Sequence, residues 1–403
     1  MTLETGCVQD QGAVKGLSVG ISGGGMNGEE RSTDSHTRPR ACLCGHSAPG
    51  GPHTHSQMSG RRVGFCVSDK KRRRMNLDAF ADFCAGHGVE VVEIDLTQPL
   101  GPQGPFDVIV HKLSDVIVEA EHDSQSQQLL ANFQSYVSAH PSTVLLDPLP
   151  AMTQLLDRFA SYQIMSQLHN SLRDWRICSP PYLEIHSASD LSSIQQAVVA
   201  QGLSFPLICK TRVAHGSLSH EMSLIFGAGS LAEIHPPCVL QSFVNHGAVL
   251  HKVFVVGDRH FCVERPSLKN FPSGPCDRKT IFFNSHQVSK PESSSDLTAL
   301  DEQMPFLPPP SSKAVAALVR ELRVQLGMAL FGVDVIINIH THTLTVIDIN
   351  IFPGYEGVPQ FFSSLLSHIE SVLDKQTSAG PQAAGSPGSA QPTGGPSAAT
   401  TGR

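Results

Sequence analysis

Apolar residues follow two periods along this chain, the two-residue period of strands and the longer period of helices, and the two alternate from residue 61 onwards. Strands are predicted over 62–67, 89–96, 106–111 and 143–146. One helix is predicted after the basic run 70–74, with apolar positions at Leu77, Phe80, Phe83 and Cys84, and another over 124–139. Strands that alternate with helices indicate an open α/β domain over residues 61–150.

The pattern changes after residue 150 and indicates two α+β lobes, at about 151–245 and 246–375. For the first lobe we predict helices over 155–170 and 190–201, separated by a break at Pro180 and Pro181, and strands over 206–211, 222–226 and 238–243. For the second lobe we predict strands over 249–256, 260–264 and 280–283, a helix over 312–326, a hairpin over 331–349 and a closing helix over 360–373.

Three segments lack a periodic apolar pattern. Residues 1–60 are rich in Gly, Ser, His and Thr, and residues 376–403 are rich in Ala, Gly, Ser and Pro. We expect both to be disordered. Residues 290–310 are rich in Ser and Pro, which is typical of a long surface loop.

Charge and composition limit the classes of function. The formal net charge of −7 disfavours a protein that holds nucleic acid through its overall field, so a polyanion would need a local basic pocket. No apolar run reaches the roughly 18–20 residues of a membrane helix. The ten cysteines show no pairing frame, and no secretory leader precedes them. We expect a soluble, cytoplasmic monomer without nucleic-acid or membrane partners.

The predicted hairpin carries the most informative polar residues. Folded symmetrically about Thr341, it places Asp334 directly opposite Asp348, and Asn350 faces the same way. Opposed carboxylates repel each other unless a cation lies between them, and hard oxygen ligands suit Mg²⁺. The sequence therefore predicts a magnesium site at these three residues.

The alternative is an exposed hairpin with polar residues on its solvent face. The same symmetric register places Ile336 opposite Val346, with Leu344 on the face that carries the carboxylates. Apolar residues on that face favour a partly buried metal site over a solvated surface.

Two basic features suggest phosphate binding. Lys210 ends an apolar strand, where its ammonium would need an anionic partner such as an ATP phosphate, although a lysine at a sheet edge also reaches solvent. The polar loop 211–220 that follows is expected to fold over phosphates. The basic run 70–74 follows the first strand, at the sheet edge where open α/β folds bind ligands, and we expect one member to reach a substrate phosphate. Its alternatives are a solvated helix entry or a nuclear-import patch.

Four segments together resemble the inositol 1,3,4-trisphosphate 5/6-kinase family, also called inositol-tetrakisphosphate 1-kinases. They are 111–113, 208–216, 265–270 and 348–357, the last including the turn from Phe352 to Gly357. The resemblance covers about 61–375. It implies an ATP-grasp fold with ATP between two lobes and the open α/β domain in front of them. It also implies ATP as co-substrate, two Mg²⁺ ions, and phosphoryl transfer to a hydroxyl of inositol tris- and tetrakisphosphates.

The resemblance also implies a role for individual residues. It makes Asp334, Asp348 and Asn350 the magnesium ligands. It assigns ATP contacts to Arg158, Lys210, Gln241, Ser242, Phe243, Val244, Ser267, Ser285 and Ser289. It assigns inositol phosphate contacts to Lys71, His220, Lys252, Asn350 and Gly354. Lys210 and His220 would be the catalytic residues, His220 as a phosphate contact or proton acceptor. The sequence departs from the family pattern in its N-terminal extension and at Ile351, where a small residue is expected.

Two other functions remain open from the sequence. The ATP-grasp scaffold also serves carboxylate–amine ligases, which the fold by itself does not exclude. A catalytically silent inositol phosphate binder is the second alternative, and the set of metal-ligand residues argues against it.

Overall fold

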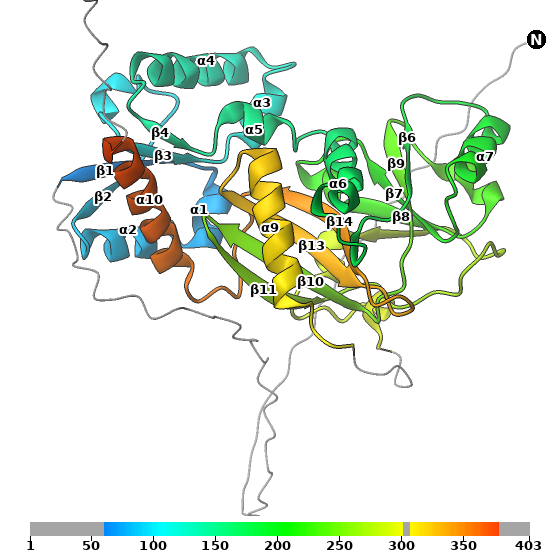
Figure 1. Ribbon diagram of the computed structural model, residues 1–403. Helices are drawn as coiled ribbons and strands as arrows, with labels where there is room; N and C mark the ends of the chain where they lie inside the picture. The colour runs from blue at the N-terminus through cyan, green and yellow to red at the C-terminus, as the bar shows by residue number, and fades with distance from the viewer. Residues whose placement is uncertain (1–59, 301–306, 379–403) are drawn as a thin grey trace, which may run out of the picture. The chain divides into compact units, whose positions relative to one another are not determined.

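The computed structural model describes residues 60–300 and 307–378 (Figure 1). The first sheet along the chain has four parallel strands. Its strand order is β2-β1-β3-β4, which places β1 between its two parallel partners. The strands are β1 (Arg61–Cys66), β2 (Val89–Glu93), β3 (Val108–His111) and β4 (Val144–Leu146). The helices are α1 (Asp69–Met75), α2 (Leu77–Ala85), α3 (Ser114–Glu119), α4 (Ser124–Ala139) and α5 (Leu149–Thr153). The open α/β arrangement predicted for this region is therefore observed.

The basic run itself forms a helix, α1, which the sequence analysis did not predict. The Ser68 hydroxyl accepts the backbone N–H of Lys71, and Asp69 lies in the first turn, where a negative charge is favourable. Asn76 ends the helix in the left-handed conformation, with φ of 54°. The chain then turns directly into α2.

A second sheet of five antiparallel strands follows, in the order β12-β8-β7-β9-β6. Its strands are β6 (Tyr182–Ile185), β7 (Leu207–Thr211), β8 (Glu221–Ile225), β9 (Cys238–Ser242) and β12 (Ile281–Asn284). The helices near it are α7 (Leu191–Ala200), α8 (Ser285–Val288) and the 3-10 turn η2 (Ser217–His220). Short elements such as β6 were not predicted, because four residues carry too little periodic signal.

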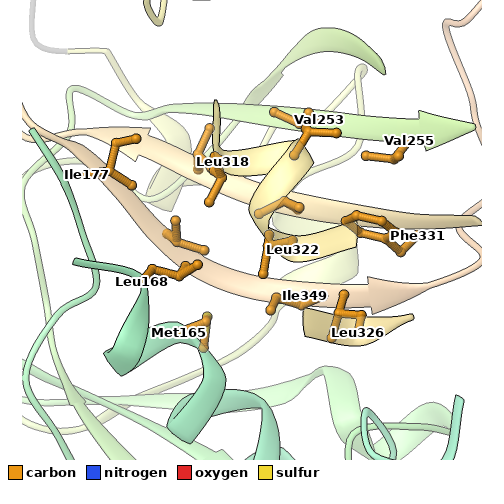
Figure 2. Close-up of a cluster of buried hydrophobic side chains, with 14 of the residues drawn as sticks. Met165, Leu168, Ile177, Val253, Val255, Leu318, Leu322, Leu326, Phe331 and Ile349 are labelled. Carbon is orange, nitrogen blue, oxygen red and sulfur yellow. The ribbon is translucent and has the colours of Figure 1, made fainter. Parts of the chain in front are cut away.

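The third sheet has the order β11-β10-β13-β14-β5. Its strands are β5 (Ile177–Cys178), β10 (Val249–Val256), β11 (Arg259–Pro266), β13 (Leu330–Ile337) and β14 (Leu344–Ile351). Helices α6 (Arg158–Leu172) and α9 (Ser312–Leu326) pack on this sheet. Figure 2 shows Leu318, Leu322 and Leu326 of α9, spaced one helical turn apart, directed at the strands.

The closing helix α10 (Phe361–Ser378) contributes to a core that includes the first sheet. The Phe362 ring lies 5.4 Å from that of Phe80 on α2. The Asp147 carboxylate, which follows β4, accepts the backbone N–H groups of Ala329 and Leu330 at 2.8 Å. This core therefore crosses the boundaries that the sequence analysis placed between its predicted domains.

Both ends of the chain bear on the disorder predictions. Helix α10 continues to Ser378, so residues 376–378 are helical rather than disordered. The predictions for 1–59 and 379–403 lie outside the described residues. In the predicted loop 290–310, the described part includes a short 3-10 turn, η4 (Asp296–Thr298). No helix in the described part of the chain is long and apolar enough to cross a membrane.

The core beneath α9 leads to a stability prediction. Leu318 is fully buried, and truncating a buried leucine leaves a cavity. We expect Leu318→Ala to lower the free energy of unfolding by about 2–5 kcal/mol in urea titrations. Val324→Ala on the same helix, at a position that is 78% exposed, should change it by less than about 0.5 kcal/mol. Equal effects at the two positions would contradict this packing.

Candidate active site

The hairpin of β13 and β14 contains a β-bulge that determines which residues face the site. Asp334 pairs with Asp348, as predicted, but Val335 pairs with Val346, so Ile347 has no partner in the ladder. The extra residue changes which side chains of β14 share a face on either side of it. Asp348 therefore faces the same side of the sheet as Asp334.

Because of the bulge, the observed strand pairing differs from the predicted one near the turn. Ile336 pairs with Thr345 rather than with Val346. Val346 and Leu344 pack in the core with residues of α9, and not on the face that carries the carboxylates. The predicted symmetric pairing is therefore correct for residues 331–334 with 348–351. It is wrong between the bulge and the turn, because the extra residue shifts the pairing there by one.

A row of three charged residues crosses adjacent strands of this sheet. Lys252 on β10 pairs with Asp334 on β13, which in turn pairs with Asp348 on β14. The Lys252 ammonium contacts both oxygens of the Asp334 carboxylate, at 3.1 and 3.0 Å. Asn350 lies two residues beyond Asp348 on the same strand and is half-buried. A lysine thus partly neutralises the paired carboxylates.

The arrangement fits a magnesium ion. Two carboxylates and an amide offer hard oxygen ligands on one face of the sheet, and the ammonium on Asp334 shows that a cation is accommodated there. Within 60–300 and 307–378, no three His, Cys, Asp or Glu side chains form a metal-binding group. The ligands supplied by Asp334, Asp348 and Asn350 would therefore be completed by water or phosphate oxygens.

Lys210 connects the second sheet to the third. It lies on β7 with an exposed fraction of 5%, and its ammonium donates to the backbone carbonyl of the bulge residue Ile347 at 2.9 Å. The Tyr162 ring lies 5.3 Å from the same ammonium. Burial lowers the pKa of Lys210 to about 8, although the nearby Asp348 acts in the opposite direction. The strand-end lysine is thus directed at the strand that carries Asp348 rather than at solvent.

Arg158, the first residue of α6, holds the loop that follows β7. Its guanidinium donates to the carbonyls of Thr211, Val213 at 3.2 Å and Ser219 at 3.0 Å. Its Nε is buried and has no partner in the described part of the chain. Arg158, which is predicted to contact an ATP phosphate, therefore also organises the polar loop 211–219.

The predicted adenine hinge lies at the end of β9. Gln241 and Ser242 are buried, and the Tyr162 hydroxyl donates to the Gln241 side-chain oxygen. The backbone N–H of Ser242 donates to the Pro181 carbonyl at 3.0 Å. Phe243 packs its ring 5.5 Å from Phe271. These contacts anchor the segment through three consecutive residues.

The buried residue His246, which the sequence analysis did not single out, connects the hinge to Ser267. Its Nδ1 donates to the Val244 carbonyl at 2.7 Å, since a carbonyl only accepts. Its Nε2 is then the acceptor for the Ser267 hydroxyl, also at 2.7 Å. Burial lowers the pKa of His246 to about 4, in keeping with a neutral ring. A single histidine between polar loops carries no sequence signal of this kind.

The turn from Phe352 to Gly357 binds two lysines of the first domain. The buried Lys71 ammonium donates to the carbonyl of Phe352 at 3.1 Å and to that of Pro353, and it lies 3.6 Å from the Phe352 ring centroid. Lys112, which follows β3, donates to the same Phe352 carbonyl at 3.4 Å. Burial lowers the pKa of both lysines. Lys112 was not among the predicted site residues, although its segment carried part of the resemblance.

The same turn places Gly354 under an acidic side chain. A Cβ on Gly354 would lie 2.2 Å from the Glu356 carboxylate. The Glu356 backbone carbonyl accepts a hydrogen bond from Arg265 at 2.7 Å.

Two of the predicted nucleotide contacts lie at helix α8. Ser285 begins α8, and the Ser289 hydroxyl donates to the Ser285 carbonyl at 3.0 Å.

The loop histidine His220 lies at the end of η2. Its ring centroid is 5.4 Å from that of His286 on α8. Burial lowers the pKa of His220, with Arg158 acting in the same direction and Asp348 in the opposite one. His220 is thus within electrostatic range of Asp348 on the third sheet.

Two domain models of one protein family match most of the described part of the chain. Residues 62–152 match the sequence model of the inositol 1,3,4-trisphosphate 5/6-kinase pre-ATP-grasp domain, and residues 171–371 match that of the ATP-grasp domain of the same kinases. The chain is thus an ATP-grasp protein. It belongs to the inositol 1,3,4-trisphosphate 5/6-kinase family.

Curated relatives agree with this placement. An inositol-tetrakisphosphate 1-kinase of Xenopus laevis is 52% identical over 319 residues, covering 79% of this chain and 80% of that protein. Inositol-tetrakisphosphate 1-kinase 3 of Arabidopsis thaliana is 35% identical, covering 78% of this chain and 85% of that protein. The crystal structure of the D-cycloserine synthetase DcsG is 13% identical, with a TM-score of 0.49, covering 78% of this chain and 99% of that one.

The contacts of Arg158 predict a dynamic role that can be measured. Arg158→Met removes charge-assisted hydrogen bonds to three loop carbonyls. We expect hydrogen exchange of the amides in 211–219 to become about tenfold to a hundredfold faster. Arg320→Met, at an exposed position on α9, is the control and should leave that exchange unchanged. Unchanged exchange in Arg158→Met would show that these contacts do not order the loop.

Proposed function

We propose that this protein transfers the γ-phosphate of ATP to a hydroxyl of inositol tris- and tetrakisphosphates. The observation that carries the proposal is the position of Lys210, whose ammonium reaches from one sheet to the bulge beside Asp348 on another. Phosphoryl transfer needs alignment and neutralisation of charge more than covalent chemistry, and a buried lysine beside paired carboxylates supplies both. Membership of the inositol 1,3,4-trisphosphate 5/6-kinase family supports the choice of substrate.

The ATP side of the site is formed by the second sheet and its loops. Lys210 and Arg158 neutralise phosphate oxygens, and the segment from Gln241 to Val244 holds the adenine through its backbone. The contacts of His246 with Val244 and Ser267 support this assignment, because they hold the segment in position through side-chain hydrogen bonds. Ser285 begins α8 and Ser289 directly follows it, and we assign both to the same nucleotide.

Magnesium is proposed at Asp334, Asp348 and Asn350, and when bound it neutralises charge on the ATP phosphates. The sequence prediction of two ions is kept as part of this proposal. The location in the cytoplasm and the monomeric state likewise stay predictions.

The inositol side of the site is formed where the first domain meets the turn after β14. Lys71 and Lys112 lie within hydrogen-bond distance of that turn, and Lys252 lies beside the carboxylates. We propose that these lysines, with His220, Asn350 and Gly354, orient the inositol phosphates so that a free hydroxyl is in line with the transferred phosphoryl group. The lowered pKa of His220 favours the neutral ring, which is the form able to accept the hydroxyl proton.

Substrate panels test the reaction class directly. ATP consumption by the full chain with Mg²⁺ is measured across inositol tris- and tetrakisphosphates, with the products resolved by chromatography. We expect particular isomers to gain one phosphate, and Asp348→Asn to lower this turnover by at least about a hundredfold without loss of stability. Asp258→Asn, with a side chain that is 70% exposed, is the matched control. Binding without turnover would indicate a silent binder, and ADP release only with a carboxylate and an amine would indicate a ligase.

The pKa of Lys210 predicts how ATP binding depends on pH. The ammonium form binds phosphate, and the pKa of Lys210 is lowered to about 8, so its contribution is present below pH 8 and is lost above it. We expect the affinity for ATP, measured by calorimetry without inositol phosphate, to fall by up to about tenfold per pH unit above pH 8. In Lys210→Met the affinity should be lower and this fall should disappear. The same slope in both proteins would assign the titration to another group.

A further inference from the structure

Three basic side chains from separate segments gather beside the proposed inositol site. The Arg74 guanidinium, in the last turn of α1, lies 2.9 Å from Nε2 of His286 on α8. The His286 ring lies 5.4 Å from that of His220 on η2. Helix α1 belongs to the first domain, whereas α8 and η2 flank the second sheet, so the chain brings these groups together only in its folded form.

The hydrogen-bond roles at His286 leave donors available. A guanidinium only donates, so Nε2 of His286 is the acceptor and the ring proton lies on Nδ1. Among the residues that the structure describes, the hydrogen bond of the His286 ring is the one from Arg74 to Nε2. Arg74 carries further N–H groups beyond the one directed at His286.

The charges around this cluster favour an anion. Burial lowers the pKa of His286, and Arg74, His220 and Lys290 lower it further, whereas Glu356 acts in the opposite direction. Neighbouring basic groups that lower the proton affinity of His286 create a positive potential around its ring, and a bound anion is favoured by that potential. The guanidinium of Arg74 is exposed, which leaves it accessible to a ligand.

Arg74 lies on the same face of helix α1 as Lys71, which contacts the turn after β14. Arg74 follows Lys71 by three residues on α1, and residues three apart lie on the same face of a helix. Lys71 points to the turn after β14, and Arg74 points to α8. His220 lies in the electrostatic reach of Asp348, Lys70 and Lys252, so the cluster borders the row of charges where transfer would occur.

We propose that Arg74 and His286 form a phosphate subsite that binds one monoester phosphate of the inositol polyphosphate and so selects among its isomers. The proposal rests on the proposed function for the substrate class. Its two residues are additional to those implied by the family resemblance. A phosphate at this position receives hydrogen bonds from the guanidinium and the imidazole, and a hydroxyl at the same ring position does not supply the negative charge that they favour.

Variants at the two positions test the subsite in the full chain. Arg74→Met and His286→Ala remove the donors, and the controls are Arg73→Met, exposed in the same turn, and His122→Ala, with a side chain that is 87% exposed. Calorimetry measures the affinity of each variant for a panel of inositol trisphosphates and tetrakisphosphates that differ by single phosphates. Steady-state kinetics gives KM and kcat for the isomers that turn over, and thermal unfolding checks stability.

We expect Arg74→Met to weaken binding of those isomers that carry one particular phosphate by about tenfold to a hundredfold. The same variant should leave isomers without that phosphate, and the KM for ATP, nearly unchanged. His286→Ala should affect the same isomers, and Arg74→Lys should restore part of the loss. The rise should appear in KM, with kcat changed by less than about threefold, because the contact is made equally before and during transfer.

Other outcomes overturn the inference in distinct ways. An equal loss for every isomer would indicate a general field rather than a subsite, and a loss of stability with unchanged affinity would indicate a structural contact. Affinities like those of the controls would remove Arg74 and His286 from the site, while wild-type turnover would leave the proposed function standing. A wild-type protein that phosphorylates no isomer would defeat the proposed function, and the binding measurements would still decide the subsite.

Discussion

The bulge at Ile347 is the feature on which the candidate site depends. One extra residue in β14 lets Leu344 and Val346 enter the core while Asp348 turns to face the same side as Asp334. The same residue presents its carbonyl to the Lys210 ammonium. Without the bulge, a regular ladder would either bury a carboxylate in the core or expose apolar side chains, and each is costly. The local irregularity thus reconciles a packed sheet with a polar site.

Backbone carbonyls are the hydrogen-bond partners of the buried cationic side chains at the site. Lys71, Lys210 and Arg158 are each at most 5% exposed, and each donates to carbonyl oxygens rather than to an acid. A carbonyl satisfies the hydrogen bond but does not cancel the charge, so the electrostatic demand for an anion remains. This explains how a chain with a net charge of −7 maintains a local site for polyanions.

Long elements were predictable because their apolar periods extend over several turns or strand repeats. Helices α4 and α9 have the predicted bounds because each buries one face, and strand β10 has them because it is a continuous apolar run that is buried on both faces. The short elements α3, α5, β5 and β6 were missed. Their few residues carry no period, and they form because neighbouring elements supply hydrogen bonds and apolar contacts.

The sequence by itself determined the order of the long elements and the facing of Asp334 and Asp348. Alternation along a strand and symmetry about a turn are local properties. Only the tertiary structure decided the shift at Ile347, the joint binding of Lys71 and Lys112 by one turn, and the meeting of Arg74 with His286. The two residues of that last pair are 212 positions apart. Such contacts depend on how whole elements pack, which no short-range pattern of residues records.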